Sequence, residues 1–323
     1  MLQLKNLVSA LFLALLATLF SALLRHIPLR SATTFVVNRN LTSSAMSSAA
    51  STFSPLNPNV KLVPRLNTQR GGANHGWLKT FHTFSFAGYW DPRYTSFGKL
   101  QVINEDRVEP TRGFGTHGHD EMEIFSYIVS GELEHKDSMG NLEILKRGDI
   151  QLTSAGTGIR HSEYNRNDKS VVHFLQIWAE PHTRGLKPKY FTRHFTDEEK
   201  TDKLVTVVAP VGSEGVKEER EGSGPAPVQS KVTLKSTILT PGNSVEHVFP
   251  APASGETQRK GYVHVIQTSG YNTGAAKGNK VRVNGGLELS EGDGAFAWGA
   301  AGDKLQIENV GTTPAEVLVF DVE

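Results

Sequence analysis

The feature that most constrains the fold of this 323-residue chain is a pattern of β-strand and turn signals that occurs twice. Each copy contains a β-branched run, a Ser-Gly pair, a hairpin whose turn holds Gly and Asn, and a Gly-Asp pair that precedes another strand. The first copy covers Ile124–Leu152 and the second covers Val263–Ala297. Internal duplication of this kind indicates two similar β-domains in tandem. The alternative is an antiparallel protein that happens to repeat its hairpins.

Composition agrees with an all-β chain and limits its chemistry. The sequence has 31 Gly and 15 Pro residues between short apolar runs, which favours strands and turns over helices. It has no Cys, so any bound metal must use His and carboxylate ligands. The net charge is +1, and nothing in this balance predicts direct binding to nucleic acid.

The boundary between the two β-domains is predicted from a charged, Gly-rich segment without aromatic residues that begins at Gly212. We therefore expect an N-terminal extension over residues 1–60, a first domain over 61–211, a linker over 212–230 and a second domain over 231–323. The apolar run Leu204–Val208 is expected to form a strand, and strands can cross between the domains.

The N-terminal extension has the composition of a targeting or anchor segment. Residues 7–24, from Leu7 to Leu24, are uncharged and just long enough to cross a bilayer as a helix, so membrane contact is predicted there. The following segment is basic and rich in Ser and Thr, as organelle transit peptides are. Three interpretations stay open: a signal anchor, a cleaved presequence, or translation from Met46, which would leave a cytoplasmic or nuclear protein. Asn40 is a glycosylation acceptor only in the secretory lumen.

Two pairs of side chains predict a metal site in the first domain. In a strand, residues two apart project from the same face, so His117 and His119 share one face, and His161 and Glu163 share another. If these strands are neighbours inside a barrel, three imidazoles and a carboxylate converge on one ion and leave coordination positions open. This ligand set suits Fe(II), and also Mn, Ni, Cu or Zn.

The spacing of these residues resembles the two cupin motifs, and Glu123 is a fifth candidate ligand. The motif residues in this chain are His117, His119 and Glu123, followed by Gly156, Gly158, His161 and Asn165. The two glycines are expected to form a tight turn before the ligand strand rather than a phosphate loop, because no helix signal follows them.

The resemblance becomes closer over residues 68–182, which look like the pirin family. The stretches that carry it are Asn74–Leu78, His82–Phe86, Asp91-Pro92, Val102–Asp106, Arg112–Phe114, Thr153–Glu163 and Leu175–Trp178. The resemblance implies two tandem cupin barrels of the double-stranded β-helix, or jelly-roll, type. It also implies one ion, most simply Fe(II), held by His117, His119, His161 and Glu163, with Glu123 adjacent to the ion.

The second domain lacks these ligands. When Asp293 is aligned with Asp149, Leu305 replaces His161 and Ile307 replaces Glu163. His264 stands alone, so the second barrel is predicted to be a metal-free structural domain. Two further histidines lie in the first domain: His135 is expected to be exposed in a hairpin arm, and His173 either faces the pocket or is a satisfied buried residue.

Two classes of function follow from the resemblance. Some pirin family members resemble quercetin 2,3-dioxygenases, which implies a metal-dependent dioxygenase acting on a small enolic, flavonol-like substrate. The resemblance to nuclear pirin family members implies instead a non-enzymatic, iron-dependent co-regulator that binds a protein partner. A metal-binding stress-response protein without turnover is the third interpretation.

Overall fold

The computed structural model describes residues 57–253 and 255–323, and within these residues it is built almost entirely from β-strands. This confirms the all-β prediction. The expectations for Leu7–Leu24, Asn40 and Met46 fall outside the described residues. In the described part of the chain, no helix has the length and apolarity needed to cross a membrane.

The strands form two sheet pairs, each with one seven-stranded and one four-stranded sheet. In the first pair, the larger sheet has the order β12 (Lys189–His194), β9 (Asp149–Ser154), β6 (Glu123–Ser130), β11 (Val172–Ala179), β4 (Leu100–Val108), β3 (Leu78–His82) and β2 (Gly71–Asn74). Its smaller sheet has the order β5 (Gly113–His119), β10 (Ile159–Tyr164), β7 (Leu133–Asp137) and β8 (Leu142–Leu145).

The second sheet pair repeats this arrangement. Its larger sheet has the order β1 (Lys61–Arg65), β20 (Gly294–Gly299), β17 (Arg259–Val265), β22 (Ala315–Val322), β15 (Val232–Leu239), β13 (Val205–Pro210) and β14 (Ala226–Val228). Its smaller sheet has the order β16 (Ser244–Val248), β21 (Lys304–Asn309), β18 (Lys277–Val283) and β19 (Leu287–Glu291). A short 3-10 helix, η1 (Asn67–Gln69), and one helical turn, α2 (Asp197–Lys200), complete the described elements.

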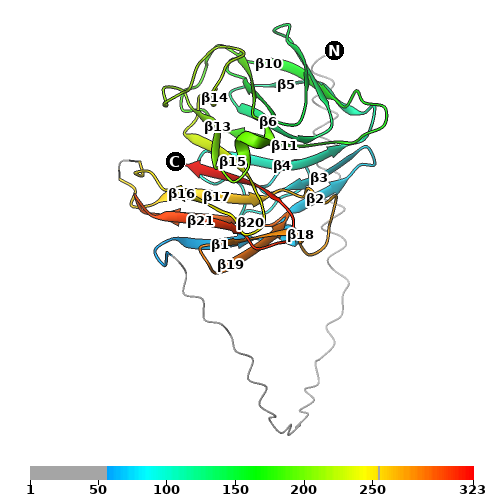
Figure 1. Ribbon diagram of the computed structural model, residues 1–323. Coiled ribbons are helices and arrows are strands. Elements are labelled where there is room, and N and C mark those ends of the chain that lie inside the picture. The colour runs from blue at the N-terminus through cyan, green and yellow to red at the C-terminus, as the bar shows by residue number, and fades with distance from the viewer. Residues whose placement is uncertain (1–56, 254) are drawn as a thin grey trace, which may run out of the picture. The chain divides into compact units, whose positions relative to one another are not determined.

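The matching strand orders confirm the duplication seen in the sequence. Both predicted hairpins are present, as β7–β8 and β18–β19. In Figure 1 the strands β5 and β10 lie at one end of the described region, and β18 and β19 lie at the other.

Sheet pairing departs from the predicted domain limits at three strands. The strand β1 pairs with β20, and β13 pairs with β15, so residues from within 61–211 complete the second sheet pair. The strand β14 lies inside the predicted linker because Ala226 and Val228 are fully buried. Strand exchange therefore ties the two halves together at both ends of the first domain.

Three apolar clusters hold the fold together. The largest fills the space between the two seven-stranded sheets, with Phe125 and Leu175 from the first half facing Tyr262 and Phe320 from the second. A second cluster fills the second sheet pair, and a smaller one lies in the first sheet pair, beside Leu133. The first sheet pair has the smaller apolar core because much of its interior is polar.

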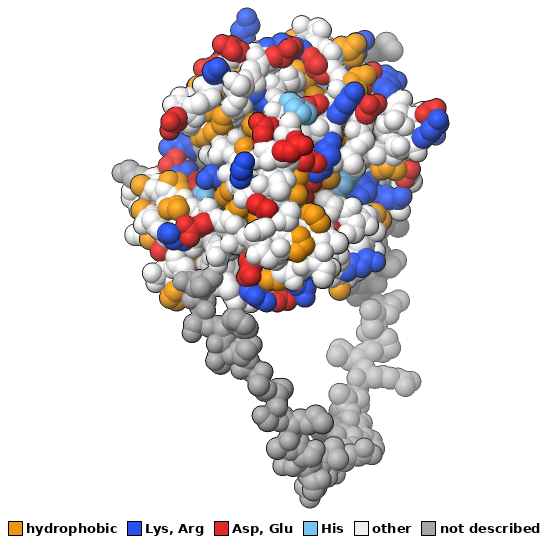
Figure 2. All heavy atoms as spheres, viewed as in Figure 1, with side chains coloured by type: hydrophobic (Ala, Val, Ile, Leu, Met, Phe, Trp, Pro, Cys, Tyr) orange, Lys and Arg blue, Asp and Glu red, His pale blue; other side chains and the backbone are white. Residues whose placement is uncertain are grey.

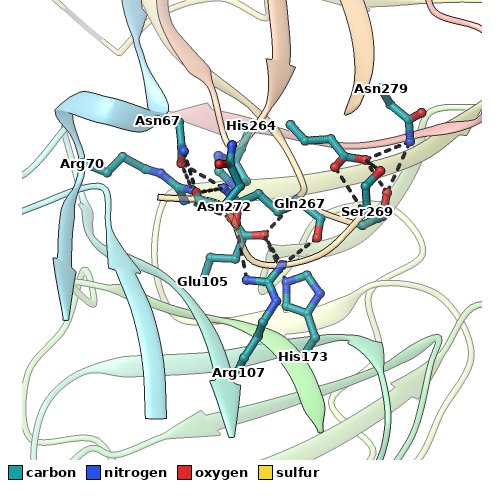
Figure 3. Close-up of polar contacts among 12 residues, drawn as sticks. Asn67, Arg70, Glu105, Arg107, His173, His264, Gln267, Ser269, Asn272 and Asn279 are labelled. Carbon is teal, nitrogen blue, oxygen red and sulfur yellow. Dashed lines mark hydrogen bonds and ion pairs between the residues drawn. The ribbon is translucent and has the colours of Figure 1, made fainter. Parts of the chain in front are cut away.

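A buried polar network centred on Glu105 of β4 lies between the halves. Its carboxylate accepts from Arg70 Nη1 at 3.0 Å, and it contacts His173 Nε2 at 3.0 Å and His264 Nε2 at 3.2 Å, as Figure 3 shows. Both histidines are therefore buried and contact Glu105 through Nε2, whereas Nδ1 of His264 has no hydrogen-bond partner, and neither residue lines the metal pocket. Although burial opposes ionisation, the hydrogen bonds of His173 and His264 and the charge of Arg70 hold the pKa of Glu105 well below its usual range.

Candidate metal centre

The predicted ligands lie on two neighbouring strands of the smaller first sheet. The strands β5 and β10 are antiparallel, with His161 opposite His117 and Ile159 opposite His119. A register shift between His161 and Glu163 brings Glu163 opposite Phe114. Strand alternation and this bulge turn the His side chains and the carboxylate toward the interior of the first sheet pair.

Three of the four predicted ligands form one compact group. The ligand nitrogens of His117, His119 and His161 all lie within 4.8 Å of one another, and the Nε2 atoms of His117 and His161 are 3.1 Å apart. Two nitrogens bound at right angles to one ion, each at about 2.1 Å, lie about 3 Å apart. The spacing therefore fits two imidazoles that share one divalent metal ion.

The ring orientations also fit metal binding. The Nδ1–H group of His117 donates to the Gly115 carbonyl at 2.8 Å, which leaves Nε2 with its lone pair. Nδ1 of His161 lies 3.4 Å from Nδ1 of His135, and Nε2 of His135 lies 3.1 Å from a carboxylate oxygen of Asp137. In His117 and His161, Nε2 is thus the nitrogen left free to bind an ion.

The prediction that His135 is exposed is wrong. Its side chain is fully buried and stacks on Tyr190 with ring centroids 4.6 Å apart. Alternation along β7 turns His135 and Asp137 inward together, beside His161 on the neighbouring strand β10. This His-x-Asp spacing in the hairpin arm was the available signal for a residue that orients a ligand.

Burial keeps the imidazoles of His119 and His161 neutral. Burial, followed by the neighbouring His161 and His117, lowers the pKa of His119 to about 4. Burial, followed by His135 and His117, lowers the pKa of His161 to about 3. Metal binding requires the neutral imidazole, so these two side chains are in their ligating form across the physiological pH range.

Glu163 lies in the same interior but in a second group of ligand atoms, with His161 and His135. It is almost fully buried, and its two carboxylate oxygens accept hydrogen bonds from Gln151 Nε2 at 3.1 Å and Gln176 Nε2 at 2.8 Å. Burial raises its pKa above the usual value. The two glutamines, which sequence reasoning missed, fix the orientation of this carboxylate.

Glu123 does not belong to the His cluster, contrary to its expected place beside the ion. Its carboxylate accepts from Ser154 Oγ at 2.5 Å and from the Gln229 backbone N–H at 3.0 Å. Burial raises its pKa to about 7. Glu123 therefore connects β6 to β9 and to the chain that follows β14, and its role is structural.

A cavity of about 440 Å³ opens beside the cluster, and His117, His119 and Glu163 line part of it. The other residues that line it are Trp77, Phe86, Asn104, Asp106, Gly113, Phe114, Gly115, Gln176 and Trp178. Gly113 and Gly115 lie on β5, and a Cβ at Gly113 would lie only 2.2 Å from the Glu163 carbonyl oxygen. Close approach of β5 and β10 therefore requires glycine at this position.

The turn before the ligand strand is confirmed. Gly156 has a φ of +46°, and a Cβ there would lie 2.0 Å from the Leu186 carbonyl oxygen. The N–H of Gly158 donates to the Ala155 carbonyl at 2.9 Å and closes the turn. His161 then follows in β10.

The corresponding interior of the second sheet pair is apolar at the aligned positions. Leu305 and Ile307 are fully buried in its core. Leu305 is paired with His247, which is the counterpart of His117 and which the sequence analysis did not single out. His247 contacts Asp321 at 3.2 Å and Lys235 at 3.2 Å. The expectation of a metal-free second barrel stays a prediction.

The fold and this cluster define a class: a duplicated all-β protein whose first half holds a histidine-rich site that fits a divalent metal. The profile of the pirin family matches residues 64–179. A quercetin 2,3-dioxygenase of Escherichia coli K12 is 37% identical over 258 residues, which cover 80% of this chain and 97% of the relative. This chain belongs to the pirin family, within the cupin superfamily.

Two further comparisons agree. The crystal structure of the bacterial pirin YhhW from Escherichia coli in complex with nickel(II) matches with a TM-score of 0.67 and 35% identity, and covers 81% of this chain and 99% of that chain. A pirin-like protein from Caulobacter vibrioides is 35% identical over 185 residues, which cover 57% of this chain and 76% of the relative.

Proposed function

We propose that this protein binds one divalent metal ion, Fe(II) in its native state, through His117, His119, His161 and Glu163, and that it is a dioxygenase of enolic, flavonol-like compounds. The observation that carries the proposal is the cavity, because the same space is lined by His117, His119 and Glu163 and by four large aromatic side chains. A flat ring system with an oxygen donor at one edge suits such a space. The similarity to the Escherichia coli quercetin 2,3-dioxygenase supports this substrate class.

A bound divalent metal would supply Lewis-acid chemistry toward the substrate oxygen and redox chemistry toward dioxygen. In a dioxygenase reaction both oxygen atoms of O₂ enter the products and the enolic substrate supplies the electrons, so no external reductant is needed. The aromatic walls would hold the substrate and exclude water.

Glu163 is the residue placed to accept the enol proton. It lines the cavity, and burial raises its pKa toward the range in which a carboxylate serves as a general base. Glu123, the other carboxylate considered from the sequence, does not line the cavity and accepts from Ser154 and Gln229 elsewhere, so it has no place in this step.

The test is oxygen uptake by the full-length, iron-loaded protein with quercetin as substrate. Wild type and a His182→Ala control, which changes an exposed histidine, are expected to consume oxygen. The His117→Ala/His161→Ala variant is expected to lose iron and oxygen uptake together. Iron retained by wild type without uptake over a panel of enolic substrates would contradict the enzymatic proposal and favour the iron-dependent co-regulator.

A further inference from the structure

The cavity is lined by both aromatic and polar side chains. Its four aromatic residues form two edge-to-face pairs, Trp77 with Phe114 at 5.2 Å and Phe86 with Trp178 at 5.5 Å between ring centroids. Trp178 also contacts the candidate ligand His119, with ring centroids 4.9 Å apart. Three of the polar residues come from alternate positions of β4 and from β11: Asn104, Asp106 and Gln176.

Two of the three polar residues already have partners. Asn104 Oδ1 is 2.8 Å from His82 Nδ1, and Gln176 donates to Glu163 at 2.8 Å. Asp106 differs from both, because its Oδ1 atom is buried without a hydrogen-bond partner within 3.5 Å and only 4% of the residue surface is exposed. The hydroxyl of Thr80, opposite Asp106 on β3, is also buried and unpaired, although its influence lowers the pKa of Asp106. Among residues 57–253 and 255–323, no ion pair involves Asp106 within 4.0 Å. An unpartnered buried carboxyl oxygen is costly unless a ligand satisfies it.

The position of Asp106 along the cavity follows from the strand register. Gln176, which holds Glu163, is opposite Asn104, whereas Asp106 is opposite Phe174, two residues before Gln176 in β11. Two residues in a strand correspond to about 7 Å. A flat ligand whose one end lies at Glu163 and the histidines would therefore extend toward Asp106 with its other end.

We propose that Asp106 is a specificity-determining residue that binds a hydroxyl group on the end of the substrate remote from the metal ligands. This inference rests on the proposed function, and it narrows the substrate class from flavonol-like compounds to those that carry a distal hydroxyl. A hydroxyl suits the site because it can both donate and accept, whereas an ether or a hydrogen atom leaves Oδ1 unpaired. Burial, with smaller contributions from Glu163 and Glu105, raises the pKa of Asp106 to about 7, so both the protonated and the ionised carboxyl are relevant at neutral pH. A substrate hydroxyl can accept from the protonated form and donate to the ionised form.

The experiment compares binding of quercetin, which carries distal hydroxyls, with binding of the parent flavonol, which has only the enolic hydroxyl. Binding is measured by calorimetry on full-length, metal-loaded protein without oxygen, so that no turnover is required. Wild type and the control Asp168→Ala, which changes an exposed loop carboxylate, are expected to prefer quercetin by about tenfold or more. Asp106→Ala is expected to lose this preference while it binds the parent flavonol as wild type does.

Asp106→Asn keeps the side-chain shape and provides a second readout if the alanine variant does not fold. Its quercetin preference is expected to fall about threefold, because a neutral amide is a weaker acceptor than a carboxylate. An undiminished preference in the folded Asp106 variants would overturn the inference and leave the dioxygenase proposal standing. Failure of wild type to bind any flavonol would overturn the substrate class itself, and with it the inference.

Discussion

The Nε2 atoms of His117 and His161 face each other at 3.1 Å across the β5–β10 strand pair. Each ring is oriented through its other nitrogen, His117 by the Gly115 carbonyl and His161 by His135. The site is therefore preorganised by residues outside the predicted ligand set, and they can be tested separately from the ligands.

The first prediction concerns His135. His135→Phe keeps the stacking on Tyr190 but removes the nitrogen that faces His161 Nδ1. Loss of such an orienting partner typically weakens metal affinity by about 10–100-fold, and we expect a decrease in this range. Metal affinity is measured by competition with a chelator, with the exposed His182→Phe as the control. Wild-type affinity in the His135 variant would show that His161 needs no orientation from β7.

The second prediction concerns the pH dependence of stability through Glu123. Its pKa is raised to about 7 in the folded protein, so the folded state binds a proton that the unfolded state has already released above about pH 4.5. Stability should therefore fall as pH rises from about 4.5 to 7. Glu123→Gln resembles the protonated form and should remove a slope of at most about 1.4 kcal/mol per pH unit.

The measurement for Glu123 is the free energy of unfolding in denaturant as a function of pH. Glu198→Gln, which changes an exposed carboxylate on α2, is the control and should leave the wild-type slope unchanged. An identical slope in wild type and Glu123→Gln would mean that Glu123 is ionised in the folded protein.

The third prediction concerns the network between the two halves. Glu105→Gln removes the charge that pairs with Arg70 at 3.0 Å in a fully buried site. Breaking a buried ion pair from one side typically costs about 3–5 kcal/mol, and we expect the free energy of unfolding to fall by that amount. Glu109→Gln breaks the half-exposed pair with Lys79 and should cost less than about 1 kcal/mol. Equal effects of the two substitutions would contradict a central role for Glu105.

Sequence periodicity predicted the features that depend on neighbours along the chain. Both hairpins, the turn at Gly156 and the inward faces of β5 and β10 follow from alternation and turn residues, and the structure contains them. The place of Leu305 in an apolar core followed in the same way. Alignment of Asp293 with Asp149 puts Leu305 at the position of His161, so Leu305 is expected on the inward face of its strand.

Features that depend on contacts between distant segments could not be predicted. Nothing local to Lys61–Arg65 indicates that this strand pairs with β20, more than 200 residues away. The burial of His135 depends on how β7 pairs with β10, and the partners of Glu123 come from β9 and from the chain after β14. Asp106 gave no signal at all, because a carboxyl group without partners is visible only once its surroundings are known.

Charged side chains of both signs are distributed over the visible surface of the protein (Figure 2). On the face shown in Figure 2, acidic and basic side chains are interspersed, and that face carries no continuous basic area. This agrees with the net charge of +1.

The measurement that tests the account most directly is the metal content of the full-length protein, purified without added chelator, as wild type and as His117→Ala/His161→Ala. The exposed-histidine variant His182→Ala is prepared in parallel. The account predicts about one divalent metal ion per chain in wild type and in the control, and loss of that ion in the double variant. Wild-type protein that binds no divalent ion, even after incubation with Fe(II), would contradict the claim that these histidines form a metal centre.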